Sequence, residues 1–134
     1  MNIATEDNCT FCRNEPETIM HLYWSCQISK NFFHQLHIFI THKCNIHLDE
    51  WGVKEVIFGL GIKDKVLNQL LLQARYYLYT CKMKNELPLL QIFKKHINIL
   101  YKIEKYNAYK NFQQTKFEDN WDKYKHLIEN SSRT

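Results

Sequence analysis

The sequence predicts a mostly helical fold with at most one short extended or β segment. Only three of its 134 residues are glycine and two are proline. An all-β sandwich needs turn residues every few positions, so this composition argues against such a fold. The apolar content of 45% and the aromatic content of 14% are those of a globular chain rather than a disordered one.

Four potential metal ligands lie within eighteen positions near the N-terminus: Cys9, Cys12, His21 and Cys26. Two thiols in a Cys-x2-Cys spacing can sit at the tip of a tight turn and point the same way. Three thiolates and an imidazole suit a closed, four-coordinate structural Zn2+ site. The alternative is a core histidine with buried thiols, since free cysteine packs as a small hydrophobe. The density of ligand-type residues favours one structural Zn2+ ion.

The second ligand pair predicts where a first helix ends. Residues 18–25 are predicted as two turns of helix, after the polar, turn-prone segment 13–17. A helix advances about 100° per residue, so His21 and Cys26 would face different directions on a continuous helix. Cys26 must therefore lie at or beyond the helix end, with Ser29 as the N-cap of the following helix.

The chain resembles one family of proteins at these residues. The runs Cys-Thr-Phe-Cys, Pro-Glu-Thr-Ile-Met-His-Leu-Tyr-Trp-Ser-Cys and Phe32-Phe33 resemble the zinc-binding segment near the C-terminus of LINE-type (non-LTR) retrotransposon reverse transcriptases. Four later stretches are similar to the tail of such proteins: 58–61, 69–84, 85–88 and 103–106. The resemblance implies a C-terminal module or fragment that assists target-primed reverse transcription. It also implies RNA or target DNA and the remaining reverse transcriptase polypeptide as partners, and a nuclear or cytoplasmic ribonucleoprotein location.

The chain length allows one domain, or a small knuckle plus one helical unit. We expect a Cys3His zinc knuckle with short helices, followed by a basic helical bundle. The expected divisions are a flexible N-terminus at 1–8, the knuckle and one helix at 9–44, a helical domain at 45–129 and a tail at 130–134.

Two stretches after the knuckle are expected to pack on the core. A helix from Ser29 is predicted by the apolar face Phe32, Phe33, Leu36, Phe39 and Ile40. The two histidines of this helix, His34 and His37, are expected to be solvated. Residues 46–61 carry β-branched side chains and glycines, which indicates a short strand or extended segment. Trp51 and Phe58 are predicted to be core residues.

The remaining helices are predicted from caps and apolar stripes. Asp64 is the expected cap of a helix that ends at Asn85 and has the inward face Val66, Leu67, Leu70, Leu71, Ala74, Tyr77, Leu78 and Cys81. Pro88 is expected near the start of an antiparallel partner with the inward face Leu89, Phe93, Ile97, Leu100 and Ile103. Thr115 to Glu118 has capping-box form for a last helix, anchored by Phe117, Trp121, Tyr124 and Ile128.

Positive charge is concentrated between residues 82 and 116, where eight lysines accompany two glutamates, while the whole chain has a net charge of +4. Lysines can neutralise phosphates, and tyrosines can stack on unpaired bases. The candidate nucleic-acid-binding residues are Lys94, Lys95, Lys102, Lys105, Tyr106, Tyr109 and Lys110. The alternative is a solvated lysine face with half-buried tyrosine rings. The absence of arginine here disfavours a strong RNA-specific site.

No catalytic motif accompanies these features. The sequence has no carboxylate pair of the polymerase type, no glycine-rich phosphate loop and no His-Glu-x-x-His motif. A four-ligand zinc site leaves no position for a catalytic water. We therefore expect no enzyme activity and no small-molecule substrate. The rival to nucleic-acid binding is a structural or protein-interaction zinc module without nucleic-acid contact.

Cysteine usage and hydropathy bear on location. Three of the five cysteines fit the metal site, and Cys44 and Cys81 remain, the former as a lightly exposed thiol and the latter as a core thiol. This pattern favours a reduced compartment over a disulfide framework. No apolar run approaches about 18 residues, and no signal peptide opens the chain. We therefore expect an intracellular protein without a membrane partner.

Overall fold

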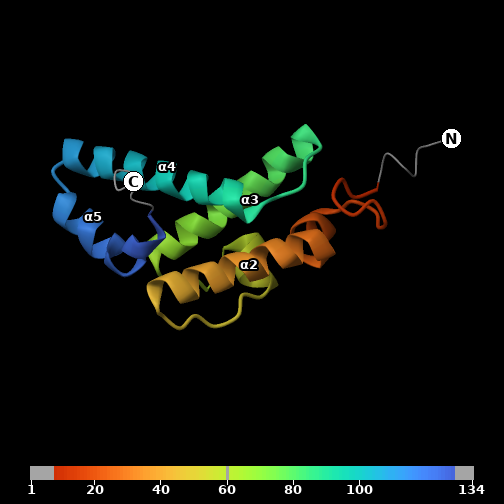
Figure 1. The fold of residues 1–134 in the computed structure, drawn as a ribbon, viewed down its shortest axis with the longest axis horizontal. Coiled ribbons are helices and arrows are strands. Elements are labelled where there is room, and N and C mark those ends of the chain that lie inside the picture. Colours follow the sequence, from red (N-terminus) through yellow and green to blue (C-terminus); the bar gives the residue numbers. More distant parts are fainter. Residues whose placement is uncertain (1–7, 60, 129–134) are drawn as a thin grey trace.

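A computed structural model describes residues 8–59 and 61–128 and confirms the mostly helical fold. Figure 1 shows an elongated arrangement of helices, with the N-terminal segment at one end and α5 at the other. Within the described residues there is no β-strand, and the isolated bridge between Asn8 and Pro16 is the only β-type pairing. In chain order the elements are η1 (His21–Ser25), α2 (Gln27–Cys44), η2 (Lys54–Phe58), α3 (Lys65–Lys84), α4 (Leu90–Lys110), α5 (Gln114–Trp121) and η3 (Asp122–Leu127).

Helix α3 forms as its caps and apolar stripe predict. The Asp64 carboxylate accepts a hydrogen bond of 3.0 Å from the Leu67 N–H, which satisfies a free donor of the first turn. Asn85 ends the helix in the left-handed conformation, with φ of 59°. All eight residues of the predicted inward face are buried.

Three helices meet at a cluster of aromatic rings. The Phe32 ring from α2 lies 5.7 Å from the Tyr77 ring of α3 and 5.6 Å from the Phe93 ring of α4. The Tyr77 hydroxyl accepts a hydrogen bond from the Leu89 N–H at 3.0 Å and donates one to the Leu89 carbonyl at 3.2 Å. Burial of such a side chain contributes about 1.5–3 kcal/mol. The cluster therefore holds the start of α4 against α2 and α3.

The C-terminal segment packs at the start of α3. Tyr124 in η3 is fully buried, and its hydroxyl donates to the Asp64 carboxylate at 3.0 Å. In α5 the Trp121 indole N–H donates to the Glu104 carboxylate at 3.0 Å. Phe117 is buried as predicted, so the apolar side chains expected to anchor this segment do so.

The strand or extended segment predicted within residues 46–61 is wrong for its second half. Residues 54–58 form a single π-helical turn, which Gly59 ends with a φ of 66°. The Arg75 guanidinium donates to the Val56 carbonyl at 2.8 Å, so a side chain of α3 satisfies the turn. Phe58 is 63% exposed rather than part of the core, whereas Trp51 is half-buried against the core. Leu60 lies outside the described residues.

One predicted helix start is wrong. Ser29 is not an N-cap, because α2 begins at Gln27 and the fully buried Ser29 hydroxyl donates to the Leu22 carbonyl. Pro88 lies near the start of α4 as predicted, two residues before Leu90, and the Tyr77 hydroxyl holds the intervening Leu89 in an extended conformation.

The apolar stripe of α4 and the cap of α5 also differ from the prediction. Leu89 and Ile103 are 57% and 53% exposed, because no other element of the described residues covers these side chains. The capping box at Thr115 is absent: α5 begins at Gln114, and Glu118 accepts instead from the Tyr109 hydroxyl at 3.3 Å. Tertiary contacts thus override the local motif.

The predicted domain division stays a prediction. One hydrophobic cluster runs from Cys9 to Leu127 and includes residues from both sides of the expected boundary at 44 and 45. The predicted flexible N-terminus lies outside the described residues except for Asn8, and the predicted tail at 130–134 lies outside them entirely.

Candidate metal centre

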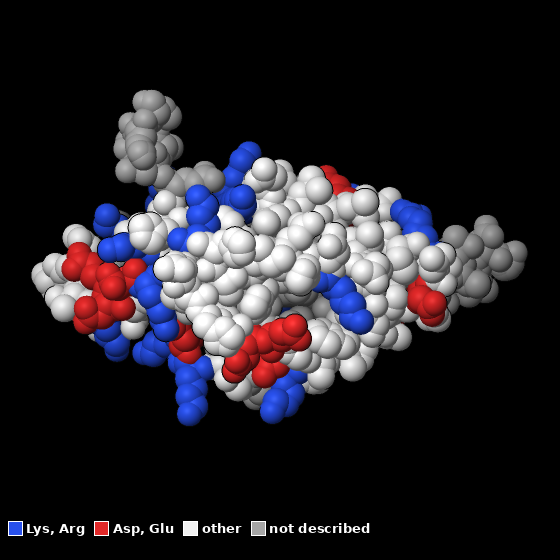
Figure 2. Space-filling view, turned by 60° about the horizontal axis from the view of Figure 1, so that its bottom comes forward, with Lys and Arg blue, Asp and Glu red and all other residues white. Residues whose placement is uncertain are grey.

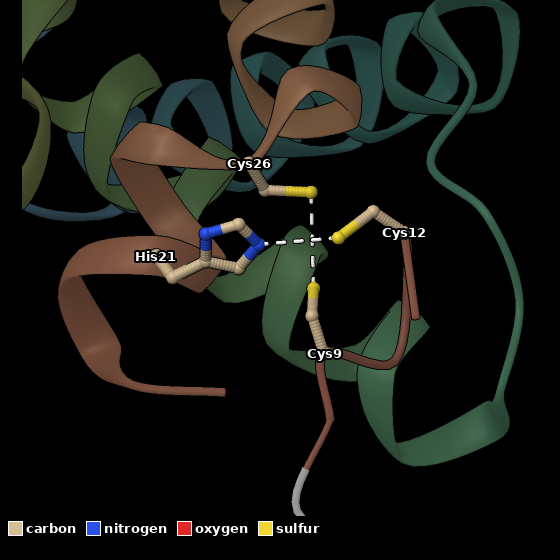
Figure 3. Close-up of side chains that lie close together, drawn as sticks. All are labelled: Cys9, Cys12, His21 and Cys26. Carbon is tan, nitrogen blue, oxygen red and sulfur yellow. Dashed lines mark hydrogen bonds between the residues drawn. The ribbon is translucent and has the colours of Figure 1, made fainter. Parts of the chain in front are cut away.

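The four predicted ligands come together at the N-terminal end of the molecule (Figure 3). Their sulfur and nitrogen atoms all lie within 4.8 Å of one another. Cys9 Sγ is 3.7 Å from Cys26 Sγ, and Cys12 Sγ is 3.2 Å from His21 Nε2. Two thiolates on a tetrahedral ion with bonds of ~2.3 Å would be ~3.8 Å apart. The four residues are therefore close enough to hold a metal ion, and the set has the size of a tetrahedral site.

A tight turn presents the first two thiols. The Arg13 N–H donates to the Cys9 carbonyl at 2.9 Å, and the Cys9 N–H donates to the Glu15 carbonyl at 2.8 Å. Arg13 takes the left-handed conformation with φ of 58°, so the chain reverses immediately after Cys12. The Asn14 N–H then points at Cys12 Sγ, at 3.4 Å. Both sulfurs therefore face the same side of the turn.

A π-helical turn carries the second pair. The Thr18 hydroxyl accepts from the His21 N–H at 3.0 Å and starts the turn, and the Cys26 N–H donates to the His21 carbonyl at 2.7 Å to close it. Cys26 itself has a ψ of 131° and lies beyond the turn, which confirms the predicted bend. The buried Ser29 hydroxyl bonds to the Leu22 carbonyl, so α2 holds the turn in place.

Glu17 connects the cysteine turn to α3. Its Oε1 accepts from both the N–H and the hydroxyl of Thr10, each at 2.8 Å, and its Oε2 lies 3.1 Å from Lys82 Nζ. Burial would raise the Glu17 pKa, but the Thr10 donors and the Lys82 ammonium outweigh burial and hold that pKa below its usual value. Sequence reasoning assigned Glu17 no role. The one feature of the sequence that could have indicated this role is the position of Glu17 between the two ligand pairs.

The surroundings shift the pKa values of the Cys9 and Cys12 thiols in opposite directions. Burial raises the pKa of Cys9 to about 11. Burial also acts on Cys12, but the Asn14 N–H, the His21 ring and the Glu15 N–H outweigh it and lower the Cys12 pKa to about 6. Among the described residues all five cysteines are free thiols. A cation among the four side chains would stabilise the thiolate form of the cysteines that bind it.

Most of the candidate nucleic-acid residues share one exposed face of α4. Lys95, Lys102, Lys105, Tyr106, Tyr109 and Lys110 are exposed, and Tyr106 is 66% accessible. Lys94 differs, since it is half-buried and its ammonium lies 4.5 Å from the centre of the Phe39 ring. In Figure 1 the end of α4 that carries the tyrosines lies far from the N-terminal segment. The structure thus keeps the metal ligands and the basic face apart.

The remaining histidines and cysteines do not join the metal site. The prediction of a solvated His37 is wrong, because Nε2 of His37 lies 3.1 Å from the carbonyl oxygens of both Leu48 and Asp49. His34 is exposed as expected. Cys44 is half-buried, and burial raises its pKa, while Cys81 is buried in the core of α3. None of these four side chains belongs to the cluster of candidate ligands.

Comparisons with protein-family models, curated proteins and solved structures find no match to this chain. The resemblance to LINE-type reverse transcriptases therefore stays a prediction. None of the helices in the described part of the chain combines the length and hydrophobicity that crossing a membrane requires.

Proposed function

We propose that this chain is a nucleic-acid-binding module whose N-terminal unit is held together by one structural Zn2+ ion. In this proposal the module assists target-primed reverse transcription as the C-terminal part of a LINE-type reverse transcriptase. The single observation that carries nucleic-acid binding is the face of α4 that carries both exposed lysines and exposed tyrosines. The sequence resemblance supplies the biological setting.

The donor set supports zinc as the metal. Three thiolates and one imidazole match the ligands that zinc takes in structural sites. All four positions of a tetrahedral ion would be filled by Cys9, Cys12, His21 and Cys26. A site filled by protein atoms has no place for a substrate or an activated water, so its role is to hold the fold. The ion would join two segments whose buried residues, Phe11 and Leu22 among them, already belong to one hydrophobic cluster.

The charges on α4 support a polyanionic partner. Lys95, Lys102 and Lys110 form no ion pair with a carboxylate of the described residues. The Lys105 ammonium lies 5.9 Å from the ring centres of both Tyr101 and Tyr109. Uncompensated lysines attract phosphates, and exposed tyrosines stack on bases that are not paired. Single-stranded RNA offers both groups and is the favoured partner, with target DNA as the other.

A salt series tests the basic face. Fluorescence anisotropy with single-stranded RNA is measured for the wild type and for the double variant Lys102→Ala with Lys105→Ala. Each neutralised phosphate contributes about −0.7 to the log–log salt slope for single strands. The double variant should therefore flatten the slope by about one to one and a half. The matched control changes Lys43 and Lys54, two exposed lysines outside α4, and should leave the slope unchanged.

Tyr106 tests stacking separately from charge. Tyr106→Ala should weaken RNA binding by about 1–3 kcal/mol with little change in the salt slope. Tyr76→Ala removes a tyrosine of similar exposure from α3 (59% against 66% for Tyr106) and serves as the control. Melting temperatures measured in parallel identify any loss of fold. If neither the lysine pair nor Tyr106 alters RNA affinity in folded protein, nucleic-acid binding by this face is refuted.

Metal analysis tests the zinc site. We expect one Zn2+ per chain and a tetrahedral, thiolate-rich spectrum after substitution with Co2+. Cys26→Ser should lose stoichiometric zinc, whereas Cys44→Ser should keep it. Full occupancy in both Cys9→Ser and Cys26→Ser would contradict the four-ligand site. Chelation should loosen the N-terminal unit more than the helices after Asp64.

One observation favours the rival function, a protein-interaction module. The outer side of α3 exposes an apolar row, Leu72, Tyr76, Tyr79 and Met83, of which Met83 is 63% accessible. If the α4 variants leave RNA affinity unchanged, this surface becomes the better candidate for function. Under either proposal we expect template–primer extension and nicking assays to read background.

A further inference from the structure

A groove of about 410 Å3 lies between η1, the first half of α2 and the segment that leads into η2. The face of the molecule in Figure 2 has a hollow near its centre, with basic and acidic side chains at its edges. Tyr23 and Trp24 line the groove from η1, and Trp51 lines it from the segment before η2. Its volume falls within the range of small-ligand sites, about 300–1,000 Å3. The face of α4 takes no part in it.

We propose that this groove binds an unpaired nucleobase together with its phosphate. The inference deepens the proposed nucleic-acid binding, on which it rests, but it uses residues other than those of α4. The base would insert among the aromatic rings, and its edge would meet the polar side chains of α2. Either a free nucleotide or a base of a single strand carries this chemistry.

The aromatic walls are held in position before a ligand arrives. The His37 ring contacts the Trp51 ring edge to face, with centres 4.9 Å apart, and Nε2 of His37 bonds to the carbonyls of Leu48 and Asp49. Trp24 lies within the π-helical turn that the Cys26 N–H closes. Both tryptophans are half-buried, so part of each side chain packs inward and part is accessible. Stacking on such rings needs little ordering on binding.

The polar wall matches the edge of a base. Gln27 and Asn31 line the groove and are four residues apart on α2, so they share one side of the helix. Each amide offers a donor and an acceptor, the combination that reads base edges. Glu50 adds an acceptor for base amino groups, and Lys30 adds a cation for phosphate. None of these four side chains has a hydrogen bond or ion pair to another described residue that would have to be broken.

Charge and polarity disfavour other occupants. An apolar peptide side chain would stack on the rings but would leave the Gln27 and Asn31 amides without partners, which costs binding energy. A methylated ammonium group would contact the rings through cation–π interaction, but it would share the groove with the Lys30 ammonium, which repels it, and with one carboxylate, Glu50. A base with an attached phosphate uses the rings, the amides and the cation together.

Tryptophan fluorescence tests the groove with the full chain. The four ribonucleoside monophosphates, ribose 5-phosphate and inorganic phosphate are titrated, followed by a short single-stranded RNA and the same strand without bases. We expect at least one base-containing probe to quench the fluorescence and the base-free probes to have no effect. The double variant Gln27→Ala with Asn31→Ala should lower the affinity for that probe at least tenfold. Gln35→Ala, an exposed amide on α2 outside the groove, is the matched control.

The outcomes separate this inference from the α4 proposal. If RNA binding depends on Gln27 and Asn31 and the monophosphates do not bind, the groove takes a base of a single strand. If the monophosphates bind, the groove takes a free nucleotide. Equal binding of RNA with and without bases, or RNA affinity that depends on Lys102 and Lys105 but not on Gln27 and Asn31, overturns the groove alone. Because the varied amides are exposed, circular dichroism should show an unchanged fold. Binding of an apolar peptide in the groove that no nucleotide displaces would also overturn the assignment.

Discussion

Glu17 offers a sharp test of how the fold supports the metal ligands. The perturbation is Glu17→Ala, which removes no ligand and no group that touches one. It removes two hydrogen bonds of 2.8 Å, from the N–H and hydroxyl of Thr10, which lies between Cys9 and Cys12. We expect the turn to lose its preferred geometry and the affinity for Zn2+ to fall while the stoichiometry stays at one ion.

The magnitude follows from the contacts. A hydrogen bond to a charged group contributes about 1.5–3 kcal/mol. Part of the turn survives through the Arg13 N–H to Cys9 carbonyl bond, so the loss in metal binding should be smaller than the sum of the two bonds. Groups that position ligands typically alter metal affinity 10- to 100-fold. We expect a decrease in affinity in that range, which corresponds to about 1.4–2.7 kcal/mol.

Competition for Zn2+ with a coloured chelator at constant neutral pH measures this affinity. Thr10→Val removes only the hydroxyl bond and should have a smaller effect than Glu17→Ala. Lys82→Met removes an ion pair whose lysine is 31% exposed, and partly exposed pairs contribute about 0–1 kcal/mol. Its effect should therefore be the smallest. An affinity for Glu17→Ala within about twofold of wild type, or a larger effect of Lys82→Met, would refute the reasoning.

Three further predictions concern the core and its pH dependence. Asp64→Ala should lower the free energy of unfolding by about 2–4 kcal/mol, because it removes the α3 cap and the partner of the buried Tyr124 hydroxyl. In urea unfolding, Tyr124→Phe should then lower the free energy of unfolding less in the Asp64→Ala background than in the wild type. Equal decreases would argue against the hydrogen bond between Tyr124 and Asp64. Ser29→Ala should cost about 1–2 kcal/mol, since the Leu22 carbonyl loses its buried donor, and an unchanged unfolding midpoint would disprove this. The folded chain lowers the pKa of Asp64, where burial is outweighed by the Leu67 N–H, Lys123 and Tyr124. Its carboxylate therefore stabilises the fold above the usual carboxyl pKa, and this contribution is lost as the pH falls below about 4. With chelator present, Asp64→Asn should show a shallower acid loss of stability than the wild type, whereas parallel curves would contradict this linkage.

Local signals in the sequence predicted the cluster of candidate metal ligands and α3 because both depend on residues close together in the chain. The Cys-x2-Cys spacing places two sulfurs on one turn, and the five-residue step from His21 to Cys26 requires the bend that is observed. Asp64 and Asn85 act through the backbone of their own helix. The apolar stripe of α3 is wide enough that all of its residues are covered.

Contacts between distant segments decided the rest. The sequence has no local sign that Tyr77 holds the start of α4 or that Arg75 satisfies the turn at Val56. Residues at the edge of an apolar stripe, such as Ile103, are covered only if a neighbouring element reaches them, and within residues 8–59 and 61–128 none does. Ser29 has the chemistry of an N-cap, but a buried carbonyl from the preceding turn takes its hydroxyl. Hydrogen-bonding groups are satisfied by whichever partner the packing brings near, so their partners depend on the tertiary structure, whereas the apolar periodicity of a helix is present in the sequence itself.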